Sequence, residues 1–213
     1  MTEIRSFTVG QVAENCHFVI NESTNACVVV DPGEEEQRLL AALTESGLVC
    51  EGILVTHTHF DHIGAVAPLA RATGAEVWCP EIELPVLADV MSFVPWPGFG
   101  PYESWNAEHS VTGGETIELA GMSFEVIHTP GHSPGHVTYV TDQGKTVLSG
   151  DVLFQGSVGR VDLPGGDWPT LLASIGEMVD RLPSDAVVYP GHGDPTTIGA
   201  ELATNPFLEE LRR

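Results

Sequence analysis

Four short apolar runs in this chain each lead through a turn into a histidine or an aspartate. The turns are THTHFDH (56–62), HTPGH (128–132), SGD (149–151) and PGHG (190–193). Apolar runs of this length, bounded by turn residues, predict strands. Loops at strand ends are where a rigid scaffold holds reactive groups. The pattern therefore predicts a strand-rich α/β fold whose strand ends carry the chemistry.

Strand-like runs and amphipathic helical stretches alternate along the chain. In the first half we expect strands in 3–9, 16–20, 26–31 and 52–56, helices in 33–47, from His62 onwards and in 81–90, and an irregular loop in 91–105. In the second half we expect strands in 116–130, 136–141, 145–151 and 186–193, a helix in 168–182 and a short helical tail. Pro68 complicates the helix that starts near His62. Two packed sheets with helices outside would cover these apolar faces.

The charge of the chain is strongly negative, with a formal net charge of −22, and Lys145 is the only lysine. Such a surface repels phosphate backbones, so we expect no nucleic-acid partner. No apolar stretch approaches the length of a membrane span, so we expect no membrane partner. The first residues lack the pattern of a secretory signal. Separated cysteines predict buried reduced thiols in a cytoplasmic protein.

The histidines and aspartates at the strand ends predict a metal site. If the strand ends converge, they place these residues around one point: His57, His59, Asp61, His62, His132, Asp151 and His192. Imidazole and carboxylate together suit borderline divalent metals, with zinc as the first choice and iron or manganese as alternatives. Seven ligands exceed the needs of one tetrahedral ion. They suit two divalent ions with an open position for water.

Several of these residues also have plainer interpretations. Asp151 follows a glycine and His132 lies among prolines and glycines, so each alone is compatible with an ordinary turn. His128 and His136 flank His132 and compete for its ligand role. We expect His128 to end a strand, with its side chain packed in the interior or supporting a metal ligand. The joint occurrence of all the motifs, in this order, favours the metal site.

The segments HTHFDH (57–62), TPGHSPGH (129–136), SGD (149–151) and PGHG (190–193) resemble the metallo-β-lactamase superfamily. The resemblance covers nearly the whole chain. GDVLFQGSVGRVDLPGGD (150–167) and TTIGAELATNPFL (196–208) look most like the short bacterial branch of glyoxalase II, the hydroxyacylglutathione hydrolases. The resemblance implies an α/β fold, the αββα sandwich of two mixed β-sheets flanked by helices, as a single domain over 1–213.

The resemblance also implies a role for each candidate ligand. The first metal would be bound by His57, His59 and His132, the second by Asp61, His62 and His192, with Asp151 bridging both. A water or hydroxide completes the bridge. Asp61 would also act catalytically by orienting this water or accepting its proton.

The sequence departs from the larger glyoxalase II enzymes in two respects. Too few residues follow His192 for their separate C-terminal helical glutathione-binding domain. Basic residues near the motifs are scarce, and Arg160 is the one candidate for a substrate contact, with a structural loop arginine as the alternative. The thiol carrier and the oligomeric state are therefore left open.

The implied activity is hydrolysis of a small-molecule thioester such as S-D-lactoylglutathione to a hydroxy acid and a free thiol, by a metal-bridging hydroxide. A first alternative is persulfide dioxygenation at a single iron held by His57, His132 and Asp151. A second is lactone hydrolysis at the same two-metal site. Hydrolysis of β-lactams ranks lower, because Asp151 stands where many of those enzymes have cysteine. A metal-binding module without catalysis ranks below all of these.

Overall fold

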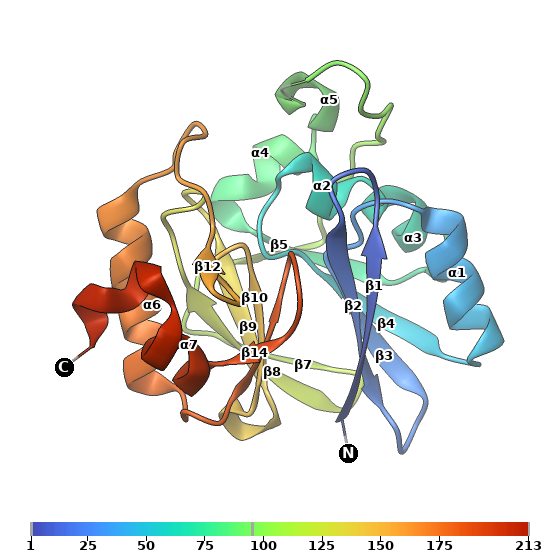
Figure 1. Cartoon of the computed structure of the whole chain (residues 1–213). Coiled ribbons are helices and arrows are strands. Elements are labelled where there is room, and N and C mark those ends of the chain that lie inside the picture. Colours follow the sequence, from blue (N-terminus) through green and yellow to red (C-terminus); the bar gives the residue numbers. More distant parts are fainter. Residues whose placement is uncertain (1, 95, 213) are drawn as a thin grey trace. The chain divides into compact units, whose positions relative to one another are not determined.

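The structure is a computed structural model that describes residues 2–94 and 96–212 (Figure 1). The described chain divides into two compact units. The first comprises residues 2–94, 96–111 and 118–122, and the second comprises 112–117 and 123–212. Each unit is described by itself below. The single domain over 1–213 stays a prediction.

The first unit is built on a six-stranded mixed sheet with the order β1-β2-β3-β4-β5-β6. The strands are β1 (Thr2–Val9), β2 (Glu14–Asn21), β3 (Ala26–Val30), β4 (Val49–Leu54), β5 (Glu76–Pro80) and β6 (His109–Val111). Strands β1 to β3 pair antiparallel, and β3 to β6 pair parallel. Parallel neighbours end at the same edge of a sheet. Asp31, which follows β3, and the THTHFDH segment, which follows β4, therefore emerge side by side.

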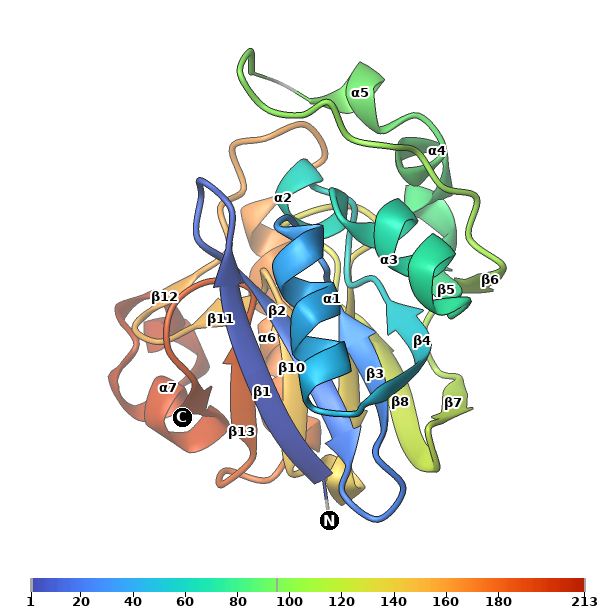
Figure 2. The ribbon, with the colours of Figure 1, turned by 90° about the vertical axis from the view of Figure 1, so that its right-hand side faces the viewer.

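Helices of the first unit pack on its sheet, as Figure 2 shows for α1 and α3. They are α1 (Glu36–Glu45), α2 (Phe60–Ile63), α3 (Val66–Thr73), a 3₁₀ helix (Glu81–Glu83), α4 (Leu84–Leu87) and α5 (Val90–Phe93). Leu39 and Leu43 of α1 and Leu69 of α3 join the same buried core as the strand residues Val29 and Ile53. Burial of this apolar face, and not helix propensity, stabilises such short helices.

Four details of the first unit differ from the sequence predictions. The helix expected in 81–90 is a 3₁₀ helix followed by α4, and Val90 already belongs to α5. The helix expected from His62 is two helices, α2 and α3, and Pro68 lies in the first turn of α3, where its missing N–H costs nothing. Strands β5 and β6 were not predicted. Strand β6 has only three residues, too few to show a periodic pattern. The loop predicted for 91–105 begins inside α5, and Pro95 lies outside the described residues.

The second unit holds a six-stranded sheet with the order β14-β13-β10-β9-β8-β7. The strands are β7 (Thr116–Leu119), β8 (Met122–His128), β9 (Val137–Thr141), β10 (Thr146–Gly150), β13 (Val187–Pro190) and β14 (Thr196–Thr197), and a separate hairpin comprises β11 (Leu153–Phe154) and β12 (Ser157–Val158). Strands β10 and β13 are parallel, and Gly191 N–H donates to Gly150 O at 2.9 Å. Asp151 and His192 therefore follow two strands that end at the same edge.

Helix α6 (Trp168–Arg181) packs on this second sheet and agrees with the helix predicted for 168–182. The carboxylate of Asp167 caps it by accepting from the Thr170 N–H at 3.0 Å. Its Leu171, Ile175 and Met178 share a buried core with Val147 of β10. The predicted helical tail is α7 (Ile198–Thr204) with a 3₁₀ helix (Pro206–Leu211), and another 3₁₀ helix spans Asp142–Gly144.

All four cysteines are buried thiols, as predicted: Cys16, Cys27, Cys50 and Cys79. Burial raises the pKa of the Cys16 and Cys79 thiols, which keeps them protonated and unreactive. No helix within residues 2–94 and 96–212 combines the length and the apolar character needed to cross a bilayer.

Candidate metal centre

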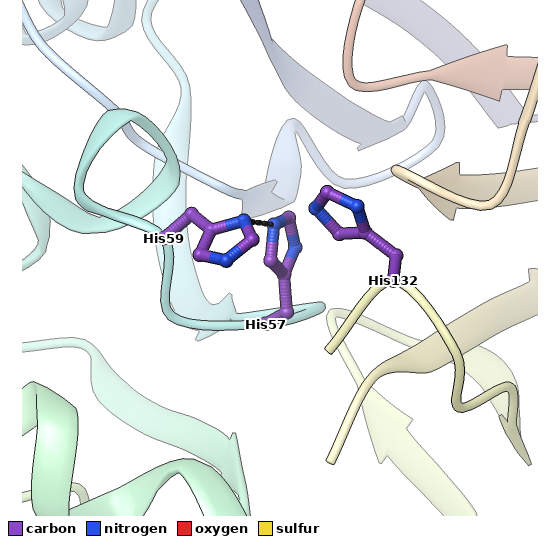
Figure 3. Close-up of side chains that lie close together, drawn as sticks. All are labelled: His57, His59 and His132. Atoms are coloured by element: carbon purple, nitrogen blue, oxygen red, sulfur yellow. Dashed lines mark hydrogen bonds between the residues drawn. The ribbon is translucent and has the colours of Figure 1, made fainter. Parts of the chain in front are cut away.

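In the first unit, residues 56–62 (THTHFDH), called the ligand segment below, follow β4 and lead directly into the one-turn helix α2. His57 Nε2 and His59 Nδ1 lie 3.1 Å apart, and the two rings are nearly perpendicular, with an interplanar angle of 83° (Figure 3). Two nitrogen ligands of one tetrahedral zinc ion, each about 2.0–2.1 Å from the metal, are about 3.3 Å apart. The alternation of His57 and His59 around Thr58 thus brings their nitrogens to the spacing that one ion needs.

Asp31 orients the side chains of this segment from the neighbouring strand. Its Oδ1 accepts the Thr56 N–H at 2.7 Å, and its Oδ2 accepts the Thr56 hydroxyl at 2.6 Å. His62 Nδ1 lies 3.1 Å from the same Oδ2. An acceptor at Nδ1 fixes the proton there, so that His62 Nε2 carries the lone pair that a metal needs.

The Thr56 hydroxyl extends this arrangement to His57. Its oxygen lies 3.0 Å from His57 Nδ1. Because the hydroxyl proton is donated to Asp31, the oxygen can accept a proton from Nδ1, which again leaves the lone pair on Nε2. Asp31 was missed by the sequence analysis. The signal was present, since ACVVVD is another apolar run that ends in an aspartate.

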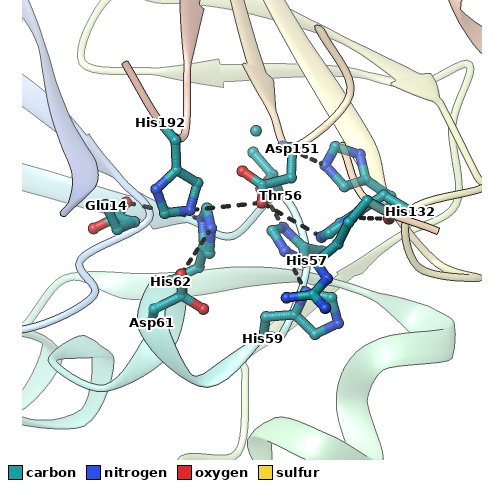
Figure 4. A network of polar contacts seen from close by, with 12 residues as sticks. Glu14, Thr56, His57, His59, Asp61, His62, His132, Asp151 and His192 are labelled. Atoms are coloured by element: carbon teal, nitrogen blue, oxygen red, sulfur yellow. Dashed lines mark hydrogen bonds and ion pairs between the residues drawn. The ribbon is translucent and has the colours of Figure 1, made fainter. Parts of the chain in front are cut away.

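Asp61 and His62 lie together at the start of α2 (Figure 4). Asp61 Oδ2 is 3.7 Å from His62 Nε2, and the His62 side chain is fully buried whereas that of Asp61 is 13% exposed. Glu14 Oε1, also buried, lies 3.8 Å from His62 Nδ1. Gly33 permits the chain to pass close behind this pair, because a Cβ on Gly33 would lie 1.7 Å from the Asp61 carbonyl oxygen.

In the second unit, one carboxylate oxygen lies between two histidines. Asp151 Oδ2 is 3.5 Å from His132 Nε2 and 3.6 Å from His192 Nε2 (Figure 4). The His132 side chain is buried, and that of His192 is 28% exposed. Gly159 allows this packing, since a Cβ there would lie 1.8 Å from the Asp151 carbonyl oxygen. An oxygen placed in this way can share metal ions with both histidines.

Two further groups hold His132 and Asp151 in place. His132 Nδ1 lies 2.8 Å from the carbonyl oxygen of Arg160 and can only donate to it, so Nε2 is the ligand atom. The Asp151 N–H donates to Nε2 of the buried His136 at 3.1 Å. His136 is therefore engaged with the main chain of Asp151 and does not compete with His132.

His128 and Arg160 differ from expectation in detail. His128 ends β8, but its side chain is exposed and not packed, with Nε2 3.2 Å from the Pro134 carbonyl oxygen. The Arg160 guanidinium makes two hydrogen bonds to the Asp162 carboxylate, at 2.7 and 2.8 Å, and these lower the pKa of Asp162 to about 2. Arg160 thus contributes its main chain to His132, and its contact with substrate stays a prediction.

The donor set fits a transition-metal ion in both units. Imidazole nitrogens and carboxylate oxygens are the ligands that zinc and iron prefer. His62 and His132 each donate the Nδ1 proton to an oxygen, which leaves Nε2 for the metal. Metal-ligating histidines commonly make such a bond with their second nitrogen. The residues brought together within the first unit are His57, His59, Asp61 and His62, and within the second His132, Asp151 and His192.

The chain belongs to the metallo-β-lactamase superfamily, whose family profile matches residues 9–192. It is 38% identical over 202 residues to hydroxyacylglutathione hydrolase GloC of Haemophilus influenzae, which covers 92% of each chain. It is similar to the crystal structure of the BLEG-1 B3 metallo-β-lactamase, with a TM-score of 0.91, 37% identity and coverage of 97% of this chain and 100% of that one. It is also similar to TTHA1623 in a di-iron-bound form, with a TM-score of 0.81, 39% identity and coverage of 96% and 100%.

These similarities confirm the predicted fold class, an α/β fold of mixed sheets flanked by helices. They also confirm the resemblance to the superfamily and to its hydroxyacylglutathione hydrolases. The family and this relative together support a metal-dependent hydrolase.

Proposed function

We propose that the chain hydrolyses thioesters of the S-D-lactoylglutathione type, releasing a hydroxy acid and a free thiol. The observation that carries the proposal is the position of Asp151 Oδ2, within 3.5 and 3.6 Å of a nitrogen of His132 and of His192. A carboxylate oxygen shared in this way suits two metal ions better than one. The similarity to a hydroxyacylglutathione hydrolase supports the choice of substrate class.

The proposed ligands are those expected from the sequence. His57, His59 and His132 would hold one divalent ion, Asp61, His62 and His192 the other, and Asp151 both. Zinc is the first choice, with iron or manganese as alternatives. Such ions, when bound, lower the pKa of a coordinated water from 15.7 to about 7 and stabilise the developing oxyanion.

The chain's own residues would orient and deprotonate the attacking water. The Asp61 carboxylate is partly exposed and lies beside His62 Nε2, which places an acceptor next to the ligand position. Asp31 and the Arg160 carbonyl keep the ring protons of His62 and His132 on Nδ1. A thiolate is a good leaving group, so a dedicated acid for its departure is not required.

Asp31→Asn tests the orienting role of this aspartate. The amide would replace one acceptor oxygen with a donor, so it cannot satisfy both Thr56 and His62. We expect the affinity for the metal in the second position to fall about 10–100-fold. Competition with a chromogenic chelator measures this change. The matched control is Asp180→Asn, on an exposed part of α6, and an unchanged affinity in Asp31→Asn would contradict the role.

Two observations favour alternative activities that the same assay can separate. One similar structure holds two irons, which keeps iron among the candidate metals, and persulfide dioxygenation at a single iron is the iron chemistry expected from the sequence. Another is named as a B3 metallo-β-lactamase, which supports keeping β-lactams, ranked lower from the sequence, among the candidate substrates. Lactones are a further class, because a hydroxide would attack an ester carbonyl in the same way.

The deciding experiment compares substrates on one metal-loaded preparation. The panel is S-D-lactoylglutathione, a γ-lactone, glutathione persulfide and a chromogenic cephalosporin, each followed together with dissolved oxygen. We expect thiol release from the thioester without oxygen uptake, at a kcat/KM well above those for the lactone and the cephalosporin. Oxygen uptake in step with persulfide consumption, with no thioester cleavage, would replace the hydrolase proposal by a dioxygenase.

A further inference from the structure

An aromatic cluster adjoins the ligand segment of the first unit. Phe60 lies between His59 and Asp61 in the sequence and contacts three aromatic rings of the loop that follows α5. The ring centroids of Phe99, Trp96 and Tyr102 lie 4.7, 5.9 and 6.1 Å from that of Phe60. These separations are typical of packed aromatic pairs. We call Phe60, Trp96, Phe99 and Tyr102 the aromatic wall.

The aromatic wall is buried at its base and exposed at its outer side. Phe60 is 7% exposed, whereas Trp96 is 42% exposed. Met91 and Phe93, at the end of α5 that leads into the same loop, are 43% and 53% exposed. Single exposed apolar residues are ordinary, but the rings of the wall contact one another and form one apolar surface of the kind that marks a binding site. In both Figure 1 and Figure 2, α5 lies above α2, the helix that carries Phe60.

The surroundings of the wall are strongly acidic. A cavity of about 260 Å³ beneath the loop is lined by Tyr102 together with Glu34, Glu35, Glu36 and Glu103. The Tyr102 hydroxyl donates to Glu34 Oε1 at 2.8 Å, which fixes one member of the wall to this acidic cavity. A carboxylate approaching the wall would meet like charge, and it would be repelled.

The basic residues of the first unit offset this charge only in part, because two of them pair with Glu35 and Glu103 of the cavity and leave the charges of Glu34 and Glu36. They are Arg5, Arg38 and Arg71, and each forms an ion pair with a glutamate, namely Glu3, Glu35 and Glu103. Within this unit, therefore, the groups next to the ligand segment are aromatic rings and carboxylates. They suit an uncharged apolar group of the substrate at this position, and a carboxylate of the same substrate would lie away from the wall.

We propose that the aromatic wall determines substrate specificity by binding an uncharged apolar group of the thioester. The proposal rests on the thioester hydrolysis proposed above and names the substrate class for that site. The apolar group belongs either to the acyl part or to the thiol part of the substrate. Both share the same chemistry, and the choice between them is made by experiment.

Steady-state kinetics with matched thioesters provide the first test. Phenylacetyl and acetyl thioesters of the same small thiol vary the acyl part, and acetyl esters of benzyl mercaptan and of methanethiol vary the thiol part. Trp96→Ala and Phe99→Ala should lower kcat/KM about tenfold or more for the apolar member of one pair. The small member of that pair should change less than about twofold. Phe207→Ala, an aromatic residue 47% exposed in the second unit, is the matched control.

Equilibrium binding provides a second test that does not depend on turnover. S-benzylglutathione and S-methylglutathione are thioethers, which the zinc-loaded protein cannot cleave. We expect calorimetry to show tighter binding of the benzyl compound, with the difference lost in Trp96→Ala. Thermal unfolding of each variant verifies that it is folded.

The outcomes separate this inference from the proposed activity. If the protein binds the benzyl thioether through Trp96 but cleaves no thioester, the wall stands and the thioesterase proposal fails. If thioesters are cleaved but Trp96→Ala and Phe99→Ala lower kcat/KM equally for apolar and small substrates, the activity stands. The wall is then not a specificity determinant, and the inference is overturned.

Discussion

Asp61→Ala is expected to lower kcat for thioester hydrolysis about a hundredfold or more, the loss seen when a principal stabilising group is removed. The substitution removes a proposed metal ligand and the proposed acceptor of the water proton together. His62 would remain oriented by Asp31, at 3.1 Å, so the fold around it should persist. The measurement is thiol release from S-D-lactoylglutathione at saturating zinc, with the metal content determined on the same sample.

The control for this substitution is Asp180→Ala, which removes an exposed carboxylate from α6 and changes the net charge equally. Its kcat should equal that of the parent chain within about twofold, because a surface change of this kind is usually small. A similar kcat for Asp61→Ala and the parent chain, with both metal positions filled, would show that Asp61 has no part in the reaction.

Removing the metals with a chelator is expected to abolish hydrolysis and to destabilise the protein. Bound ions stabilise the folded chain by mass action, by about 4 kcal/mol when the free ion is at a thousand times its Kd. The melting temperature should therefore fall by several degrees in a calorimetric scan. Return of two zinc ions per chain should restore both the melting temperature and the activity, without any uptake of oxygen.

Manganese and ferrous iron, added separately to the metal-free protein, identify the metals that support activity. Restoration of thiol release by iron alone, with zinc inert, would make iron the metal of the hydrolase, whereas activity with iron that consumes oxygen would contradict the hydrolytic role, because zinc has no redox chemistry. Full activity at one ion per chain would remove the basis for a shared role of Asp151. Magnesium, which prefers oxygen ligands, serves as the negative control.

The structure confirms several sequence predictions that concern local patterns. The strands that precede each motif were expected from their apolar runs, and the amphipathic helix α6 agrees with its predicted range. Boundaries were less accurate for α2 and α3, which are divided at Gly64 and Ala65, where the Ala65 N–H donates to the Pro32 carbonyl oxygen at 2.9 Å.

The residues that the sequence analysis missed act through contacts that are distant in the chain. Asp31 lies 31 positions before His62, and its role appears only because β3 and β4 are parallel neighbours. His136 was an open competitor for His132, and its hydrogen bond to the Asp151 N–H assigned it another role. Strand β6 was invisible because three residues carry too little periodicity.

The sequence by itself determined the types of donor atom, their order and their positions after strands, because these follow from residue identity and short-range periodicity. Only the tertiary structure decided how each donor is oriented. The proton of His62 is placed by Asp31 and that of His132 by the Arg160 carbonyl, 28 positions away. Such partners come from neighbouring strands and loops, and hydrogen bonds require atoms within about 3 Å, a proximity that chain spacing does not specify.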